Sequence, residues 1–219
     1  MRYVCMPEDS ALLSLHKSLR RCLDVIDEQQ EEWYRALIDC VPLVNTLNNL
    51  VDQLLICERV NFSQTPLRGF SILHHQIFYK LEEGIDVTLE KLNRNVRILQ
   101  GVRDAVSHHV GSVLHVYAVN ADEINLETTL ERTANSPSLA DILEWLKDTE
   151  KFFRNQHLER KNLLYMGNDH LQDIRNLYNT WEKLNDLSSI RQNIVQGTVQ
   201  MMYIFAHCCP VIRDDKWGT

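Results

Sequence analysis

A short stretch in the middle of the chain holds the residues whose types and spacing come nearest to a chemical site. His108 and His115 lie two helical turns apart, His109 is adjacent, and Asp104 precedes His108 by four residues. Imidazole and carboxylate groups on one helix face can hold a metal ion or relay protons. The alternative is that these histidines lie on a solvated polar face beside a carboxylate, and this is the interpretation we favour.

The motifs of helical and mononucleotide-binding enzymes are missing from the 219 residues. None of the nine histidines has a glutamate three residues before it, which the di-iron bundles require. The H-E-x-x-H, P-loop and G-x-S-x-G patterns are also missing. Cys22 would need a partner histidine to act as a nucleophile, and no motif supplies one. A metal-binding bundle enzyme is therefore the weaker alternative, and we predict no catalytic residue, metal or cofactor.

Composition narrows the class of protein further. The net charge of −7 argues against a general nucleic-acid binder, which would carry a basic surplus. Residues 1–10 lack the apolar core of a signal peptide, and no apolar run is long enough to span a bilayer. We therefore expect a soluble intracellular chain. Cys22 and Cys40 fall on apolar helical positions, so we expect reduced and buried thiols rather than disulfides.

Low glycine and proline content predicts helices joined by short connections. With 7 Gly and 5 Pro, the chain is expected to be all-α, as an elongated antiparallel helical bundle with long coiled-coil-like helices. An apolar stripe in steps of three and four predicts a first helix from Ser10 to about Asp39. Pro42 predicts a break there, because the residue before a proline avoids helical geometry. A helix over about 42–59 would then fold back as an αα-hairpin.

The rest of the chain continues the helical pattern. Further helices are predicted over 70–82, 85–119, around 126–132, and over 138–166, 169–184 and 187–205. Ser138 and Asp141 have the spacing of a capping box, which marks the start of the helix over 138–166. The predicted organisation is a disordered N-terminus (1–9), a long-helix bundle (10–119), a connector (120–135), a C-terminal helical segment packing on the bundle (136–205) and a disordered tail (206–219).

The helix over 138–166 is the strongest candidate for a partner-binding element, because it combines an apolar stripe with a basic end. The residues predicted to contact a partner are Leu139, Ile142, Trp145, Phe153, Arg154, Arg160 and Lys161. Trp33, Trp145 and Trp181 are more often core than contact residues; if one is exposed, we expect Trp145, since charged residues flank it and tryptophan is enriched at interface hot spots. The basic end has a structural alternative, because the helix dipole favours cations near a C-terminus.

The apolar stripes leave three arrangements open. They can pack entirely inside the monomer, or one seam can remain for a second helical chain. A third arrangement is a self-associating coiled-coil scaffold.

Four stretches taken together resemble the AIRIM family of ribosome maturation factors, which interact with Afg-type AAA+ ATPases. The longest reads SPSLADILEWLKDTEKFFRNQHLERKNLL and begins at Ser136. The second stretch lies within 28–43 and contains EQQ, Trp33, Ala-Leu and DC-x-PL. The third is VRD-x-VS-x-HV over 102–110, and the fourth runs from Asp173-Ile174 through Trp181. The resemblance covers most of 10–199 and predicts an orthologue. Residues 1–9 and 206–219 depart from the family pattern.

The resemblance implies a non-enzymatic adaptor that pairs with the helical protein CINP and joins two related AAA+ ATPases. It implies a role in cytoplasmic maturation of the large ribosomal subunit and recycling of maturation factors, with a further role in replication on chromatin. It also implies location in cytoplasm and nucleus, indirect contact with the pre-ribosomal large subunit, no membrane contact and no direct nucleic-acid binding. The family offers no catalytic residues to carry over.

Overall fold

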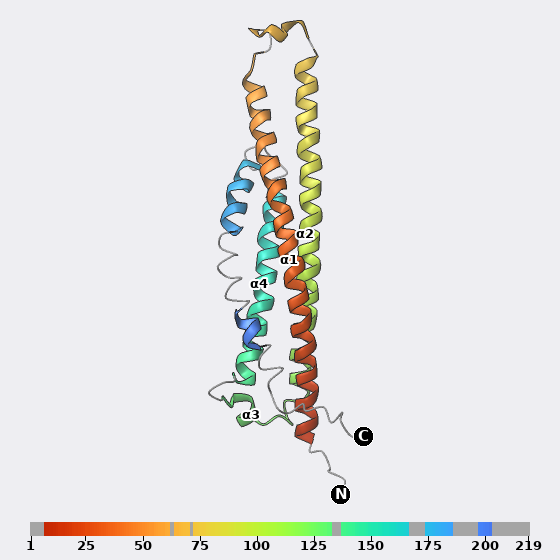
Figure 1. Cartoon of the computed structure of the whole chain (residues 1–219), viewed down its shortest axis with the longest axis vertical. Coiled ribbons are helices and arrows are strands. Elements are labelled where there is room, and N and C mark those ends of the chain that lie inside the picture. The colour runs from red at the N-terminus through yellow and green to blue at the C-terminus, as the bar shows by residue number, and fades with distance from the viewer. Residues whose placement is uncertain are drawn as a thin grey trace, which may run out of the picture. The chain divides into compact units, whose positions relative to one another are not determined.

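The computed structural model shows a chain built from α-helices (Figure 1). It describes residues 7–61, 64–70, 72–132, 137–166, 174–185 and 197–202. The elements are α1 (Pro7–Arg59), the 3-10 helix η2 (Pro66–Gly69), α2 (Leu73–Val119), α3 (Leu126–Leu130) and α4 (Leu139–Met166). Residues 174–185 and 197–202 are helical as well, and no strand occurs in the described ranges. The prediction of an all-α bundle is confirmed.

Helix α1 is continuous through Pro42, so the predicted break and the predicted αα-hairpin of 10–39 with 42–59 are both wrong. A proline inside a helix costs about 3 kcal/mol, because it removes a hydrogen bond and crowds the preceding turn. Against this, Cys40, Val44 and Leu47 continue the buried stripe without a change of phase. Burial contributes about 1.5–3 kcal/mol for each large apolar side chain, which outweighs the proline. Pro42 itself is on the exposed face.

Helix α2 joins two segments that the sequence analysis predicts as separate helices, 70–82 and 85–119. Gly84 lies inside the helix, where glycine costs about 1 kcal/mol relative to alanine. It packs on α1, since a Cβ at this position would lie 3.4 Å from both Cδ atoms of Leu50. The hairpin that the chain forms is therefore α1–η2–α2, with η2 between the two long helices (Figure 1).

The chain divides into two compact units, each assembled from segments that are far apart in sequence. Unit 1 contains residues 1–31, 101–155 and 190–219, and unit 2 contains residues 32–100 and 156–189. Helices α1, α2 and α4 each contribute residues to both units. The sequential division predicted from the sequence stays a prediction, and the predicted tail 206–219 lies outside the described residues.

In unit 1, α4 begins at the predicted capping box, which is confirmed. The backbone N–H of Asp141 donates to Ser138 Oγ at 3.2 Å, and the backbone N–H of Ser138 donates to Asp141 Oδ2 at 2.9 Å. Arg132 Nε also donates to Asp141 Oδ2 at 2.7 Å. Arg132 and then Ser138 hold the pKa of the Asp141 carboxyl well below its ordinary value. The buried apolar residues of this unit include Leu15, Leu19, Ile26, Val106, Val110, Ile142, Leu146 and Phe153.

In unit 2, the core is formed by the predicted stripes of α1 and α2 together with α4 and the 174–185 helix. Its fully buried members include Trp33 and Trp181. One apolar cluster joins Cys40, Val44, Leu47, Val51, Leu54, Ile85, Leu92, Val96, Leu164, Ile174, Leu177 and Trp181. Burial raises the pKa of the Cys40 thiol to about 11, and in unit 1 burial raises that of Cys22 to about 12. Both thiols are free and buried, as predicted.

Candidate protein-binding surface

Most of the α4 residues predicted to contact a partner lie inside the bundle. Leu139, Ile142 and Phe153 are buried in unit 1, so they can serve a partner only by positioning the helix. Trp145 is half-buried, whereas Trp33 and Trp181 are buried, which matches the expected order of exposure. A contact between any of these residues and a partner stays a prediction.

The basic end of α4 divides into an accessible part and a buried part. Arg154 is exposed and forms an i,i+4 ion pair with Glu150 at 3.7 Å. Lys161 is half-buried, and its Nζ lies 5.9 Å from the ring centroid of Tyr165. Arg160 has no accessible surface. Of the three basic residues, Arg154 is therefore the most available to a partner.

Arg160 is the centre of an interior cluster that also contains Gln156, Trp181 and Asn185. Its guanidinium donates to Gln156 Oε1 at 2.8 Å, to the Gln156 carbonyl at 3.1 Å and to Asn185 Oδ1 at 3.1 Å. The guanidinium carbon lies 5.6 Å from the Trp181 ring centroid. No ion pair joins it to a carboxylate in the described part of the chain, and burial lowers its pKa to about 10. This side chain links α4 to the 174–185 helix through its hydrogen bonds and ring contact, and it presents no charge to a partner.

The histidines that suggested metal chemistry do not form a metal site with other side chains in the described residues. His108 and His115 are exposed, His109 is half-buried, and the rings of His108 and His109 are 5.3 Å apart. Asp104 pairs with its neighbour Arg103, whose Nε donates to it at 3.0 Å. Across the described ranges, no group of three His, Cys, Asp or Glu side chains is arranged to hold a metal ion.

Helix α1 carries a second apolar face in unit 2, which the sequence analysis did not identify. Tyr34, Ile38 and Val41 are spaced by four and three residues, and we call them the α1 stripe. Tyr34 is 52% exposed and Ile38 is 54% exposed. The stripe lies one residue after the buried positions Trp33, Leu37 and Cys40, so it faces about 100° away from the core. Its 4–3 spacing was visible in the sequence and is the signal that would have identified it.

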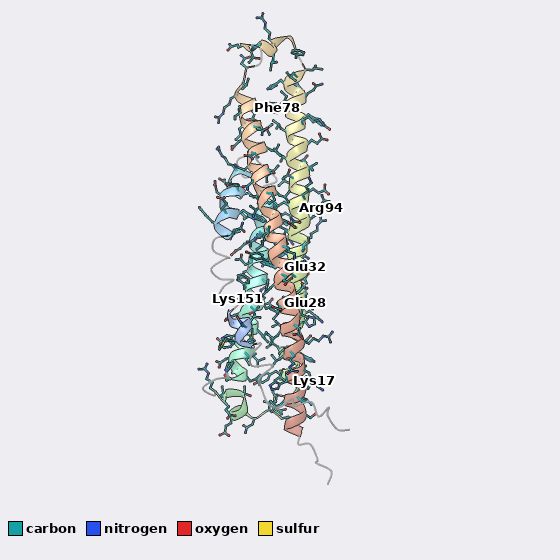
Figure 2. All side chains as sticks on the ribbon, in the orientation of Figure 1. Lys17, Glu28, Glu32, Phe78, Arg94 and Lys151 are labelled. Carbon is teal, nitrogen blue, oxygen red and sulfur yellow. The ribbon has the colours of Figure 1, made fainter. Side chains whose placement is uncertain are left out.

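A groove continues this face toward the 174–185 helix. It has a volume of about 300 Å³ and is lined by Val41, Val44, Asn45, Tyr178, Trp181, Glu182 and Asn185. The Tyr178 hydroxyl donates to Glu182 at 2.8 Å on one wall. Exposed Glu32 precedes the stripe by two residues on α1 (Figure 2). The α1 stripe and this groove together form an apolar surface with a polar rim, the general arrangement of a protein interface.

The described helices include none that is both long and apolar enough to cross a membrane. Fold and surface together define an all-α bundle protein that carries an exposed apolar face on helix α1.

The chain belongs to the CA109-like family, described as ribosome biogenesis protein C1orf109-like, whose model matches residues 13–202. It is 42% identical over 200 residues to a Xenopus tropicalis protein, covering 91% of this chain and 98% of that relative. It is 37% identical over 203 residues to a Homo sapiens protein, with coverage of 91% and 98%. A Mus musculus protein is 35% identical over 185 residues, with coverage of 83% and 84%. All three relatives are named AFG2-interacting ribosome maturation factor.

Proposed function

We propose that this chain is a non-enzymatic adaptor of an Afg-type AAA+ ATPase and acts in maturation of the large ribosomal subunit. Its similarity over 91% of its length to relatives named AFG2-interacting ribosome maturation factor carries the proposal. An adaptor needs no reaction centre of its own, but it needs accessible binding surfaces. The α1 stripe is one accessible surface of this kind.

The α1 stripe takes a second helical protein, for which CINP is the candidate. Apolar side chains at i, i+4 and i+7 form a strip that an amphipathic helix can cover along its length. The neighbouring groove extends that strip by about one turn of α1 and along the 174–185 helix. The adaptor would then consist of this chain and CINP in a 1:1 pair, which together engage the ATPase.

Mixing the purified chain with CINP tests this proposal. The expected product is a 1:1 complex in size-exclusion chromatography with light scattering. Ile38→Glu should abolish the complex by placing a charge in the strip, while Val119→Glu at the exposed end of α2 should leave it intact. Chains that stay separate at micromolar concentration would contradict the proposal.

A cellular experiment tests the link to ribosomes. Depleting the protein should trap a maturation factor on cytoplasmic large-subunit precursors, because its ATP-driven removal would lack the adaptor. Wild-type chain should restore release and Ile38→Glu should not. Imaging the tagged chain in the same cells tests the proposed presence in cytoplasm and nucleus, and its association with replicating chromatin.

Self-association through the α1 stripe is the second candidate, because the same strip would suit another copy of the chain. Light scattering on the isolated protein separates the two. A monomer that becomes a heterodimer with CINP favours the adaptor, whereas a homodimer disrupted by Ile38→Glu favours the scaffold.

A further inference from the structure

The turn between α1 and α2 concentrates exposed apolar side chains in a short part of unit 2. We call the described residues within 56–80 the hairpin tip. Phe70 and Ile72 are each 64% exposed and Tyr79 is 62% exposed. Ile56, Val60 and Leu67 are exposed as well. These six are more than a third of the large apolar side chains exposed in the described residues, so their clustering needs an explanation.

The backbone of the hairpin tip is held by local hydrogen bonds. Thr65 Oγ1 accepts from the backbone N–H of Leu67 at 3.2 Å and so caps η2. The N–H of Phe70 donates to the Leu67 carbonyl at 3.0 Å, and the N–H of Leu73 donates to the Phe70 carbonyl at 3.1 Å. These bonds hold the backbone at Leu67 and Phe70, which lowers the backbone entropy lost on binding.

A side-chain contact joins the two helices below this turn. His74 Nε2, at the start of α2, donates to the Cys57 carbonyl near the end of α1 at 3.3 Å. The His74 ring also lies 4.8 Å from that of Phe78, which is labelled in Figure 2. A groove of about 530 Å³ lies on the first turns of α2, lined by Ile72, His75, Gln76, Tyr79 and Lys80. The tip thus combines projecting apolar side chains with a shallow apolar groove.

The charge of the hairpin tip is opposite to that of the whole chain. Residues 56–80 contain Arg59, Arg68 and Lys80 but a single acid, Glu58, whereas the chain carries a net charge of −7. Lys80 is partly neutralised by an ion pair with Glu83 at 2.6 Å. The first turn of α2 has no acidic residue, so the positive end of its helix dipole adds to the same sign. A complementary partner surface would be apolar at its centre and acidic at its rim.

We propose that the hairpin tip inserts into an apolar pocket rimmed by carboxylates on the AAA+ ATPase, an inference that rests on the proposed function. The tip draws its apolar side chains from the end of α1, from η2 and from the start of α2, so it forms no helical strip for CINP. A second copy of the chain would bring Arg59 and Arg68 toward the same charges, which opposes self-association. A protruding apolar turn requires a concave partner, and one different from the partner of the α1 stripe.

The experiment compares matched double variants of the full chain, each assembled with CINP where it still binds. Binding to the purified recombinant ATPase hexamer is measured by biolayer interferometry. Phe70→Ser with Ile72→Ser should weaken ATPase binding by at least about tenfold and leave the 1:1 pairing with CINP unchanged. Tyr34→Ser with Ile38→Ser should have the opposite effect. It should weaken the pairing with CINP and preserve the direct binding of this chain to the ATPase.

A charge variant and a vesicle control complete the test. Arg59→Glu with Arg68→Glu should weaken ATPase binding and reduce its dependence on salt, because the attraction between the basic tip and the carboxylate rim is lost. Unchanged affinity of the Phe70/Ile72 variant would overturn the tip inference alone, while failure of wild-type protein to bind the ATPase would overturn the proposed function with it. Tip-dependent sedimentation with phosphatidylserine vesicles, without tip-dependent ATPase binding, would identify a lipid surface instead and also overturn the inference.

Discussion

The interior cluster and the hairpin tip lie in the same unit and contain the same residue types, but the cluster is buried and the tip is exposed. Each combines arginine with aromatic side chains: Arg160 with Trp181 in the cluster, and Arg68 with Phe70 and Tyr79 at the tip. In the cluster, hydrogen bonds and ring contacts join these groups to one another, and both are fully buried. At the tip, the apolar side chains face solvent.

This difference shows that residue type alone does not separate interior from interface. Aromatic and arginine side chains are favoured at binding hot spots, yet the same pair can complete a core when another helix covers it. Substitutions in the two regions should therefore act on different measurements, stability for the cluster and partner binding for the tip.

Replacing Trp181 with alanine should have the largest effect. Removing a fully buried tryptophan costs about 3–5 kcal/mol, because the cavity is filled only in part and Arg160 loses its ring contact. Urea unfolding monitored by circular dichroism gives the change in unfolding free energy. A loss below about 1 kcal/mol would mean that the cluster contributes little to the fold of unit 2.

Thiol reactivity gives the next largest contrast. Cys40 is buried and its raised pKa, about 11, leaves almost no thiolate at pH 8, whereas half-buried Cys57 lies at the tip. Iodoacetamide should label Cys57 at least about a hundredfold faster, equivalent to ~2.7 kcal/mol in rate. Peptide mass spectrometry resolves the two sites. Because the neutral thiol is favoured in the fold, its contribution to stability is present below pH 9 and lost as the pH rises toward 11.

Substitutions of Arg160 separate its hydrogen bonds from its charge. Arg160→Ala should cost about 1.5–3 kcal/mol, since hydrogen bonds from a charged group are lost along with packing. The lowered pKa means that the folded state binds this proton less tightly than the unfolded chain does, so the buried charge opposes folding at neutral pH. Arg160→Met keeps the aliphatic bulk without the charge and should cost less than alanine in parallel urea titrations. Equal losses would show that the hydrogen bonds dominate.

Phe70→Ser with Ile72→Ser at the tip should have the smallest effect on stability, within about 0.5 kcal/mol, because both side chains are mostly solvated in the fold. The same urea titration measures it. A loss of 2 kcal/mol or more would show that the tip belongs to the fold, and the contrast with the interior cluster would disappear.

The sequence alone predicted the features that depend on local periodicity. The buried stripes, the capping box at Ser138 and the burial of Cys22 and Cys40 all follow from helical spacing, and all are confirmed. Continuity through Pro42 was missed, because a local rule about proline was outweighed by packing along the whole helix.

The functional surfaces were harder to predict from sequence. Burial of Arg160 depends on the 174–185 helix, which lies many residues further along the chain, so no local pattern could reveal it. The hairpin tip spans the end of one predicted helix, 42–59, and the start of another, 70–82, and no local pattern distinguished its exposed apolar residues from buried ones. The α1 stripe had a period, but a neighbouring and stronger stripe one residue away obscured it.

The division of both units among distant segments has a consequence for biosynthesis. Unit 2 takes its last segment from residues 156–189, and unit 1 takes its last from 190–219. A translating ribosome must therefore deliver almost the whole polypeptide before either core can close. In a nascent chain paused at the end of α2, the apolar faces of α1 and α2 would lack the later helices that bury them. We expect such a chain to depend on chaperones until synthesis finishes.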